Sequence, residues 1–109
     1  MALTRDFKET IQARVLAESK FRDTLLREGI DTMLAGDVDG GKAIQRDYIK
    51  ATIGFEKLGL ATGSSPKSLI RMFGPGGNPQ ARNLFAVFRQ LQRQAGLALH
   101  VRAQKNGRP

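Results

Sequence analysis

Residues 55–73 read FEKLGLATGSSPKSLIRMF, and this stretch decides the fold of the chain. Its apolar residues recur at helical spacing on both sides of a break at residues 62–65 (TGSS). Gly63 supplies the backbone freedom for a turn, Ser65 is a good N-cap, and Pro66 is a favourable first helical residue. The stretch therefore predicts two short amphipathic helices joined by a tight turn. This arrangement is typical of a helix-turn-helix, whose second helix lies in the major groove of DNA.

The two helices are expected to separate a core side from a solvent side. The residues expected to face inward are Leu58, Leu60, Leu69, Met72 and Phe73. Gly59 is expected where the two helices approach closely, a place that requires a small side chain. The residues least needed by the core are Lys67, Ser68, Ile70 and Arg71. An ordinary helical hairpin with a solvated basic face would show the same pattern, so the motif by itself leaves both interpretations open.

The net charge of +8 is placed unevenly along the chain. Residues 1–53 contain nine Lys or Arg and nine Asp or Glu, so this half is neutral. Residues 54–109 contain nine Lys or Arg and one acid, Glu56, and account for the whole excess. Because the excess coincides with the helix-turn-helix pattern, it favours nucleic-acid binding over a basic surface without a partner.

The composition argues against several other classes of protein. The chain has no cysteine, which excludes a disulfide framework, a thiolate zinc site and a cysteine nucleophile, and fits a reducing cytoplasm. No apolar run approaches membrane-spanning length, and the first ten residues lack the apolar core of a signal peptide. We therefore expect a soluble, cytoplasmic protein with no membrane partner.

Segments that begin like catalytic or ligand-binding motifs are incomplete. Residues 37–40 (DVDG) start like a calcium loop, but Gly41 replaces the third acid and Tyr48 stands where the bidentate glutamate belongs, so a helix cap is favoured. Residues 74–77 (GPGG) lack the following Lys-Ser/Thr of a nucleotide-binding P-loop. His100, the sole histidine, has no acid or nucleophile near it in the sequence. We expect no catalytic residue, no metal and no cofactor, and hence no enzyme.

The rest of the chain predicts an all-α, compact bundle of about five to six helices. Outside the pair at 55–73, helices are expected over about 4–17, 21–34, 37–51 with Asp37 as cap, and 80–95. Asn78 is the expected N-cap of the last helix and Pro79 its first residue, and Phe85 is expected on the apolar face of this helix. Alternation at 97–102 predicts a short β-strand, which needs a partner strand. We expect one domain at 1–103, made of N-terminal helices at 1–53, a helix-turn-helix core at 54–96 and the strand, with a disordered basic tail at 104–109.

Three stretches resemble a known family of proteins. They are GDVDGGKA and RDYI within 36–49, ATGSSPKSLIRMFGPGGNPQARNLF at 61–85, and the helix that continues from there with LALHV at 97–101. In them the chain resembles the helix-turn-helix antidote proteins (antitoxins) of bacterial toxin–antitoxin modules, a branch of the repressor-like DNA-binding fold. The resemblance implies a homodimer that binds operator DNA, represses its own operon and neutralises a small toxin, often an RNase.

The resemblance also implies which residues contact double-stranded DNA. The groove-facing positions are occupied by Ser65, Pro66, Lys67, Ile70 and Arg71. Of these, Lys67 and Arg71 are expected to reach base edges. Asn78, Arg82 and the backbone amides at the start of the last helix are expected to hold phosphate, and Ser68 to contact phosphate or a base.

Other functions remain open from the sequence. The chain is also compatible with a stand-alone regulator without a toxin, and with a protein-interaction module that mainly neutralises a partner. Non-specific nucleic-acid binding through the basic half is a further alternative. The dimer interface is open among the strand, the helix at 80–95 and the N-terminal helices, and no residue marks a surface for a toxin.

Overall fold

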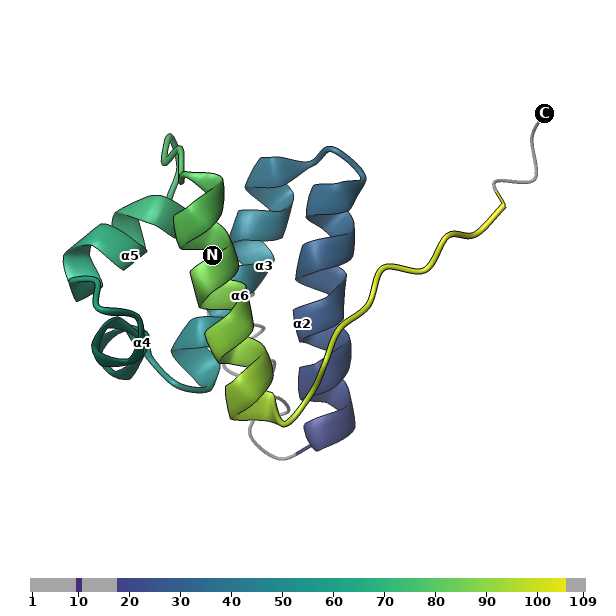
Figure 1. Ribbon diagram of the computed structural model, residues 1–109, viewed down its shortest axis with the longest axis horizontal. Helices are drawn as coiled ribbons and strands as arrows, with labels where there is room; N and C mark the ends of the chain where they lie inside the picture. The colour runs from purple at the N-terminus through teal and green to yellow at the C-terminus, as the bar shows by residue number, and fades with distance from the viewer. Residues whose placement is uncertain (1–9, 11–17, 106–109) are drawn as a thin grey trace.

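The computed structural model describes Thr10 and residues 18–105. In this part of the chain five helices follow one another and pack together (Figure 1). They are α2 (Ser19–Leu34), α3 (Val38–Ala51), α4 (Phe55–Thr62), α5 (Pro66–Phe73) and α6 (Ala81–Ala95). The prediction of an all-α fold is confirmed for these residues. The helix expected over 4–17 lies outside them, apart from Thr10.

Helices α2 and α3 run side by side because glycines let their backbones approach (Figure 1). A Cβ at Gly29 would lie 2.6 Å from Gln45 Nε2, and a Cβ at Gly41 would lie 2.8 Å from the Gly29 carbonyl oxygen. Both distances are shorter than real Cβ atoms show.

Tyr48 is also buried in α3, and this burial raises the pKa of its phenol, with the Asp23 carboxylate acting in the same direction.

The turn between α2 and α3 follows the predicted chemistry. Gly36 adopts a left-handed conformation with φ of 99°. Asp37 is the N-cap of α3, and its Oδ1 accepts a hydrogen bond from the Gly40 amide at 2.9 Å. The helix cap that the sequence favoured over a calcium loop is therefore confirmed.

The turn between α4 and α5 is also as predicted. Gly63 follows α4 with φ of 74°, and Ser65 Oγ accepts a hydrogen bond from the Ser68 amide at 3.1 Å, which caps α5 ahead of Pro66. A Cβ at Gly59 would lie 2.5 Å from the Ser64 carbonyl oxygen, so the close approach at this glycine is confirmed. The turn thus allows only a small residue in α4 at this point.

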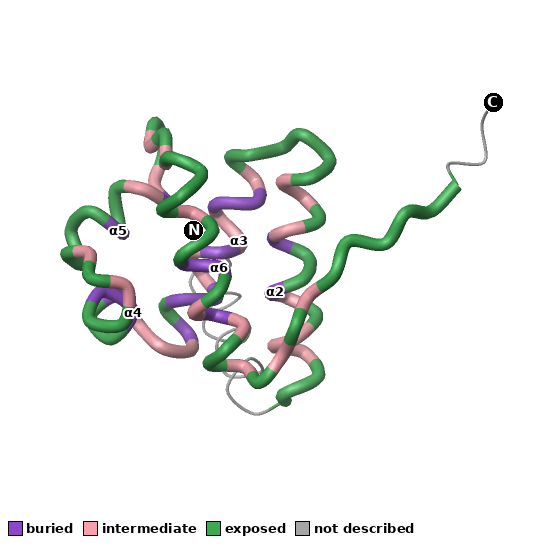
Figure 2. The backbone as a smooth tube through the Cα atoms, viewed as in Figure 1, coloured by how far each residue is buried: buried purple, intermediate pink, exposed green. Residues whose placement is uncertain are grey.

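One buried cluster joins helices from the neutral and the basic halves of the chain. Figure 2 shows buried residues in each of the five helices. The cluster consists of Leu26 from α2, Tyr48 and Ile49 from α3, Phe55 and Leu58 from α4, Leu69 and Phe73 from α5, and Val87 and Leu91 from α6. The short helices α4 and α5 are therefore stabilised by burial against α3 and α6, since eight-residue helices are marginal in isolation.

Two expected core residues are exposed instead. Leu60 is 87% exposed, so the prediction that it faces inward is wrong. It follows Leu58 by two residues, which is about 200° around a helix, and therefore lies on the opposite side. Phe85, expected on the apolar face of the last helix, is 64% exposed.

The predicted cap of the last helix is also wrong. Helix α6 begins at Ala81, and its N-cap is Gln80, not Asn78. Gln80 is extended, with φ of −68° and ψ of 145°, and its side chain makes no capping hydrogen bond. The chain therefore remains extended past Pro79. The Gln80 carbonyl, not that of Asn78, is the first acceptor of the helix and is bonded by the Leu84 amide at 3.0 Å.

The predicted strand at 97–102 is not present in the described chain. After Gly96 the backbone has no regular structure; it passes beside α2, where Leu97 and Leu99 pack against the core, and then leaves the helices (Figure 1). Leu97 donates its amide to the Gln92 carbonyl at 2.9 Å, and Leu99 donates to Gln92 Oε1 at 2.8 Å. Among the described residues no second segment pairs with this one, and a strand forms only where a neighbour satisfies its backbone groups.

Candidate nucleic-acid interface

The outward side of α5 carries the side chains that the sequence assigned to base contacts. All five candidates, Ser65, Pro66, Lys67, Ile70 and Arg71, are exposed. Leu69 and Phe73 on the inward side are 2% and 1% exposed. Lys67 and Arg71 share one side of the helix because they are four residues apart. An apolar residue is exposed beside them, since Ile70 retains 49% of its accessible surface.

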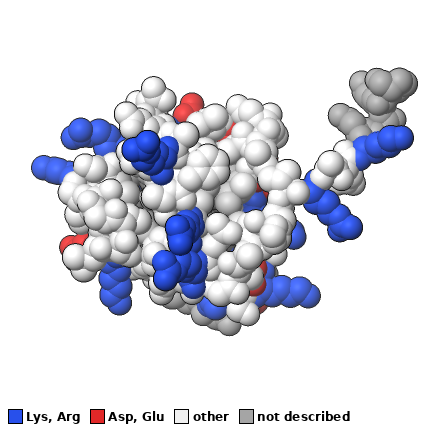
Figure 3. All heavy atoms as spheres, in the orientation of Figure 1, with Lys and Arg blue, Asp and Glu red and all other residues white. Residues whose placement is uncertain are grey.

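The cations Lys67, Arg71 and Arg82 form no ion pair with the described residues. In the described part of the chain no carboxylate lies within 4.0 Å of Lys67, Arg71 or Arg82. Figure 3 shows Lys and Arg atoms spread over α4, α5 and α6, with few Asp or Glu atoms among them. The charge is therefore available to an anionic partner and is not used to hold the fold together.

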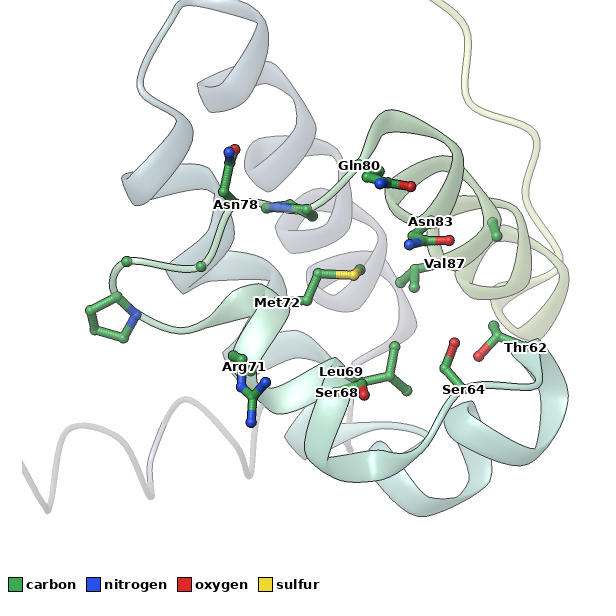
Figure 4. A pocket seen from close by; sticks show the side chains of 15 residues that line it. Thr62, Ser64, Ser68, Leu69, Arg71, Met72, Asn78, Gln80, Asn83 and Val87 are labelled. Carbon is green, nitrogen blue, oxygen red and sulfur yellow. The ribbon is translucent and has the colours of Figure 1, made fainter.

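A groove lies between α5 and the start of α6, with a volume of about 500 Å3 (Figure 4). Its polar lining comes from three segments: the turn before α5, α5 itself, and the loop that leads into α6. The polar side chains lining it include Ser64, Ser68, Asn78, Gln80 and Asn83. Figure 4 shows Asn83 and Met72 projecting into the groove. The groove thus offers neutral hydrogen-bond donors beside the basic face of α5.

The three predicted phosphate contacts are all exposed but do not form one cluster. Ser68 and Asn78 line the groove, whereas Arg82 does not. The Ser68 hydroxyl also accepts a hydrogen bond from Ser65 Oγ at 2.9 Å. Gln80 and Asn83 line the groove and were not predicted. The feature of the sequence that could have indicated them is a pair of amide side chains three residues apart at the start of a predicted helix.

The start of α6 borders the groove and has free backbone donors. The first intrahelical bond of α6 is from the Leu84 amide to the Gln80 carbonyl at 3.0 Å, so the amides before it have no partner within the helix. Such amides, together with the helix dipole, favour a negatively charged group such as phosphate. That these amides hold phosphate stays a prediction, and the helix that presents them starts at Ala81, two residues after the expected first residue, Pro79.

Two cations of α3 hold the other side of the loop. Lys42 Nζ donates to the carbonyls of Gly74 at 3.1 Å and Gly77 at 2.6 Å, and Arg46 Nη1 donates to the Phe73 carbonyl at 3.5 Å. Neither residue was predicted from the sequence. The helical spacing could have indicated that Lys42 is buried, because it lies three residues before Gln45 and seven before Ile49, on the side of α3 that faces the core.

Neither membrane crossing nor metal binding finds support in the described residues. None of the helices in this part has the length and apolar character that a bilayer requires. No three His, Cys, Asp or Glu side chains there are grouped as metal ligands would be.

Comparison of the chain with protein-family models, with curated proteins and with solved structures finds no match. The resemblance to toxin–antitoxin antidotes therefore remains a prediction from the sequence.

Proposed function

We propose that the chain is a sequence-specific DNA-binding regulator in which α4, the turn and α5 form a repressor-like helix-turn-helix. The observation that carries this proposal is the outward face of α5. Lys67, Ile70 and Arg71 are exposed there, the two cations have no acidic partner in the described chain, and the opposite face is buried in the core. A face of this kind contributes little to folding and suits contact with a ligand.

The dimensions and chemistry of α5 suit the major groove. An α-helix with side chains is roughly 10–12 Å wide, and the major groove of B-DNA is about 12 Å wide. Arg71 is suited to guanine, whose O6 and N7 accept two hydrogen bonds from one guanidinium group. Lys67 is suited to the same acceptors. Ile70 is suited to the 5-methyl group of thymine, an apolar contact that polar side chains do not make.

The groove beside α5 supports a second set of contacts. With α5 among the bases, a phosphate backbone would pass the polar lining that includes Ser68 and Asn78 and the free amides at the start of α6. Contacts of this kind fix the position of the protein on DNA without reading sequence. Arg82, exposed on the first turn of α6, would add charge on the same helix.

We also propose that the protein binds as a homodimer. Exposed apolar side chains and the unpaired C-terminal segment support this part of the proposal. Leu34, Phe85 and Val101 are 63%, 64% and 80% exposed, and all three line a hollow of about 270 Å3 beside α2 and α6. A two-fold dimer predicts half-sites about 34–36 Å apart. From the resemblance we further propose that the regulator is the antitoxin of a toxin–antitoxin module and represses its own operon.

A second candidate function is that of a protein-interaction module that neutralises a partner protein. The same apolar surface at Leu34, Phe85 and Val101 favours it, since exposed apolar patches mark protein contacts. This function predicts a stable complex whose affinity does not change when Lys67 and Arg71 are replaced. Size-exclusion chromatography of the chain mixed with the product of the adjacent gene measures this.

The test of DNA binding starts with selection of duplexes from a random library and with the DNA upstream of the protein's own gene. Gel shifts at fixed salt then compare the best duplex with random competitor for the wild type, Arg71→Ala and Lys50→Ala. Lys50 is the matched control, because it is an exposed cation of α3 in the neutral half. We expect Arg71→Ala to lower discrimination roughly 5- to 150-fold, the effect of losing one bidentate contact, and Lys50→Ala to leave discrimination unchanged.

Salt dependence separates base reading from charge attraction. Each lost phosphate contact lowers the slope of log K against log salt by about 0.9, so Arg82→Ala should lower the slope with similar effects on selected and random DNA. A wild-type protein that binds selected and random duplexes equally at every salt concentration contradicts the proposed function.

A further inference from the structure

We infer that Lys42 is a positioning residue of the DNA interface. Its buried ammonium group fixes the loop at 74–77 and thereby sets the start of α6 relative to α5. The part of this inference that concerns DNA rests on the proposed function, whereas the part that concerns the loop does not.

The ammonium group of Lys42 is fully engaged. The residue is 2% exposed, although lysine is rarely buried. Its three N–H donors match three oxygen acceptors. Nζ lies 3.1 Å from the Gly74 carbonyl oxygen, 2.6 Å from the Gly77 carbonyl oxygen and 3.5 Å from Asp39 Oδ1. The Asp39 side chain, on α3, is 89% exposed. Two of the three contacts of Lys42 are therefore with the loop, and the third is with an exposed carboxylate.

The loop itself has few other contacts that would fix it. Its own turn is closed by a hydrogen bond from the Gly77 amide to the Gly74 carbonyl at 3.1 Å. Pro75 and Gly76, in the middle of the loop, are exposed. A Cβ at Gly77 would lie 2.8 Å from the Met72 carbonyl oxygen, so the loop is seated directly on the end of α5. Lys42 therefore bonds both ends of a segment whose middle is exposed.

This loop connects the two surfaces that the proposed function uses. Arg71 lies on α5 just before the loop, and Asn78 and Gln80 lie just after it. Lys42 and Arg46 bond carbonyls at the end of α5 and in the loop, and both belong to α3, which is part of the scaffold. Helix α3 thus sets the distance between α5, the base-facing helix, and the phosphate-facing start of α6. Specific binding needs both contacts at once, so a loose loop should weaken specific binding more than non-specific binding.

Stability is a poor explanation for a cation at this place. A buried charge pays a large desolvation penalty, which offsets much of what its contacts contribute to stability. Lys42→Met keeps an unbranched chain out to the ε position and removes the ammonium group with all three donors. It should therefore retain the helical fold and release the loop.

The experiment compares Lys42→Met and Lys42→Arg with the wild type, with Lys50→Met as the matched control on the exposed side of α3. The first measurement is hydrogen exchange in the free protein of the Gly77 amide, which donates the hydrogen bond that closes the loop. The second is the ratio of affinities for the best selected duplex and a random duplex at one salt concentration. We expect Lys42→Met to raise exchange in the loop at least tenfold, to leave α2 and α3 protected, and to lower the affinity ratio at least tenfold. Lys42→Arg should keep most of the protection of the loop and most of the affinity ratio. Lys50→Met should change neither the loop exchange nor the affinity ratio.

Two outcomes overturn the inference. In one, the loop of Lys42→Met is protected as in the wild type; in the other, the loop is released but the affinity ratio is unchanged. If Lys42→Met does not fold, Lys42→Gln decides, because its shorter side chain keeps polar donors but leaves the position of Nζ empty. A folded Lys42→Gln protein with a reduced affinity ratio supports the inference, and one with an unchanged ratio overturns it. A wild-type protein without any preference refutes the proposed function instead, and the exchange measurement still tests the hold of Lys42 on the loop.

Discussion

Two pairs of helices in this protein are joined by turns of the same length, yet the two pairs pack in different ways. Residues 35–37 join α2 to α3, and residues 63–65 join α4 to α5. Each turn has a left-handed glycine and ends in a side chain that caps the next helix. The glycine is second in the first turn and first in the other. Figure 1 shows α2 and α3 side by side, whereas α4 is seen nearly end-on and α5 lies across it.

The difference lies in what each pair packs against. Helices α2 and α3, of 16 and 14 residues, contact each other along their length through glycines. Helices α4 and α5, of eight residues each, meet near their turn and depend on α3 and α6 for the rest of their burial. The long pair therefore forms the scaffold. The short pair keeps one face free because that face has nothing to pack against.

The largest expected effect tests whether the two pairs share one core. Leu26 in α2 and Leu58 in α4 are both 0% exposed. We expect Leu26→Ala and Leu58→Ala each to lower the free energy of unfolding by about 2–5 kcal/mol, with one cooperative transition in both. Urea titration followed by circular dichroism measures this, and Leu60→Ala, at an 87% exposed position, is the control. A separate early transition in Leu58→Ala would show that the short pair unfolds on its own.

The next effect compares the two caps. Asp37 and Ser65 each accept one backbone hydrogen bond, at 2.9 and 3.1 Å. We expect Asp37→Ala and Ser65→Ala each to destabilise the protein by about 1 kcal/mol, as loss of an N-cap usually does. Ser64→Ala, one residue before the second cap, should change stability by less than about 0.5 kcal/mol. Thermal unfolding measures all three, and a loss at Ser64 equal to that at Ser65 would contradict the assignment of the cap.

A smaller effect concerns the apolar side chain on the free face. If Ile70 contacts a thymine methyl group, its removal costs about 0.8 kcal/mol per methylene buried, or about fourfold in affinity for the selected duplex. The same duplex with deoxyuridine in place of thymine should bind the wild type more weakly by a similar factor. Ile70→Ala should then bind both duplexes equally. An Ile70→Ala protein that still prefers the thymine duplex would assign the methyl contact to another residue.

The smallest effect is expected at Leu60. Because this side chain is 87% exposed on α4, Leu60→Ser should change the free energy of unfolding by less than about 0.5 kcal/mol. Chemical denaturation of this variant beside Leu58→Ala gives the comparison directly. A loss of several kcal/mol at Leu60 would mean that a contact covers this surface.

Features set by local chemistry could be predicted from the sequence. Gly63, Ser65 and Pro66 act within a few residues of one another, and so the turn and the start of α5 were predicted correctly. The outward set on α5 was also predictable, because eight residues of one helix divide by period alone. Leu60 was assigned inward because its apolar character was given more weight than its angular position.

Features that depend on distant partners could not be predicted. Lys42 bonds carbonyls 32 and 35 residues further along the chain, and the path of that loop decides where α6 begins and which amide side chains line the groove. The C-terminal segment has strand-like alternation, but a strand also needs a neighbour. Nothing in the alternation of 97–102 says where such a neighbour would come from.

The free face of α5 has a consequence for how this protein can change over generations. Residues 67, 70 and 71 are not in the buried core, so mutations can accumulate there without loss of the fold. Gly59 and Gly77 leave no room for a side chain and tolerate no such drift. After gene duplication, two copies of this chain can therefore diverge on this face while both continue to fold in the same way; under the proposed function, they would then differ in the DNA that they prefer.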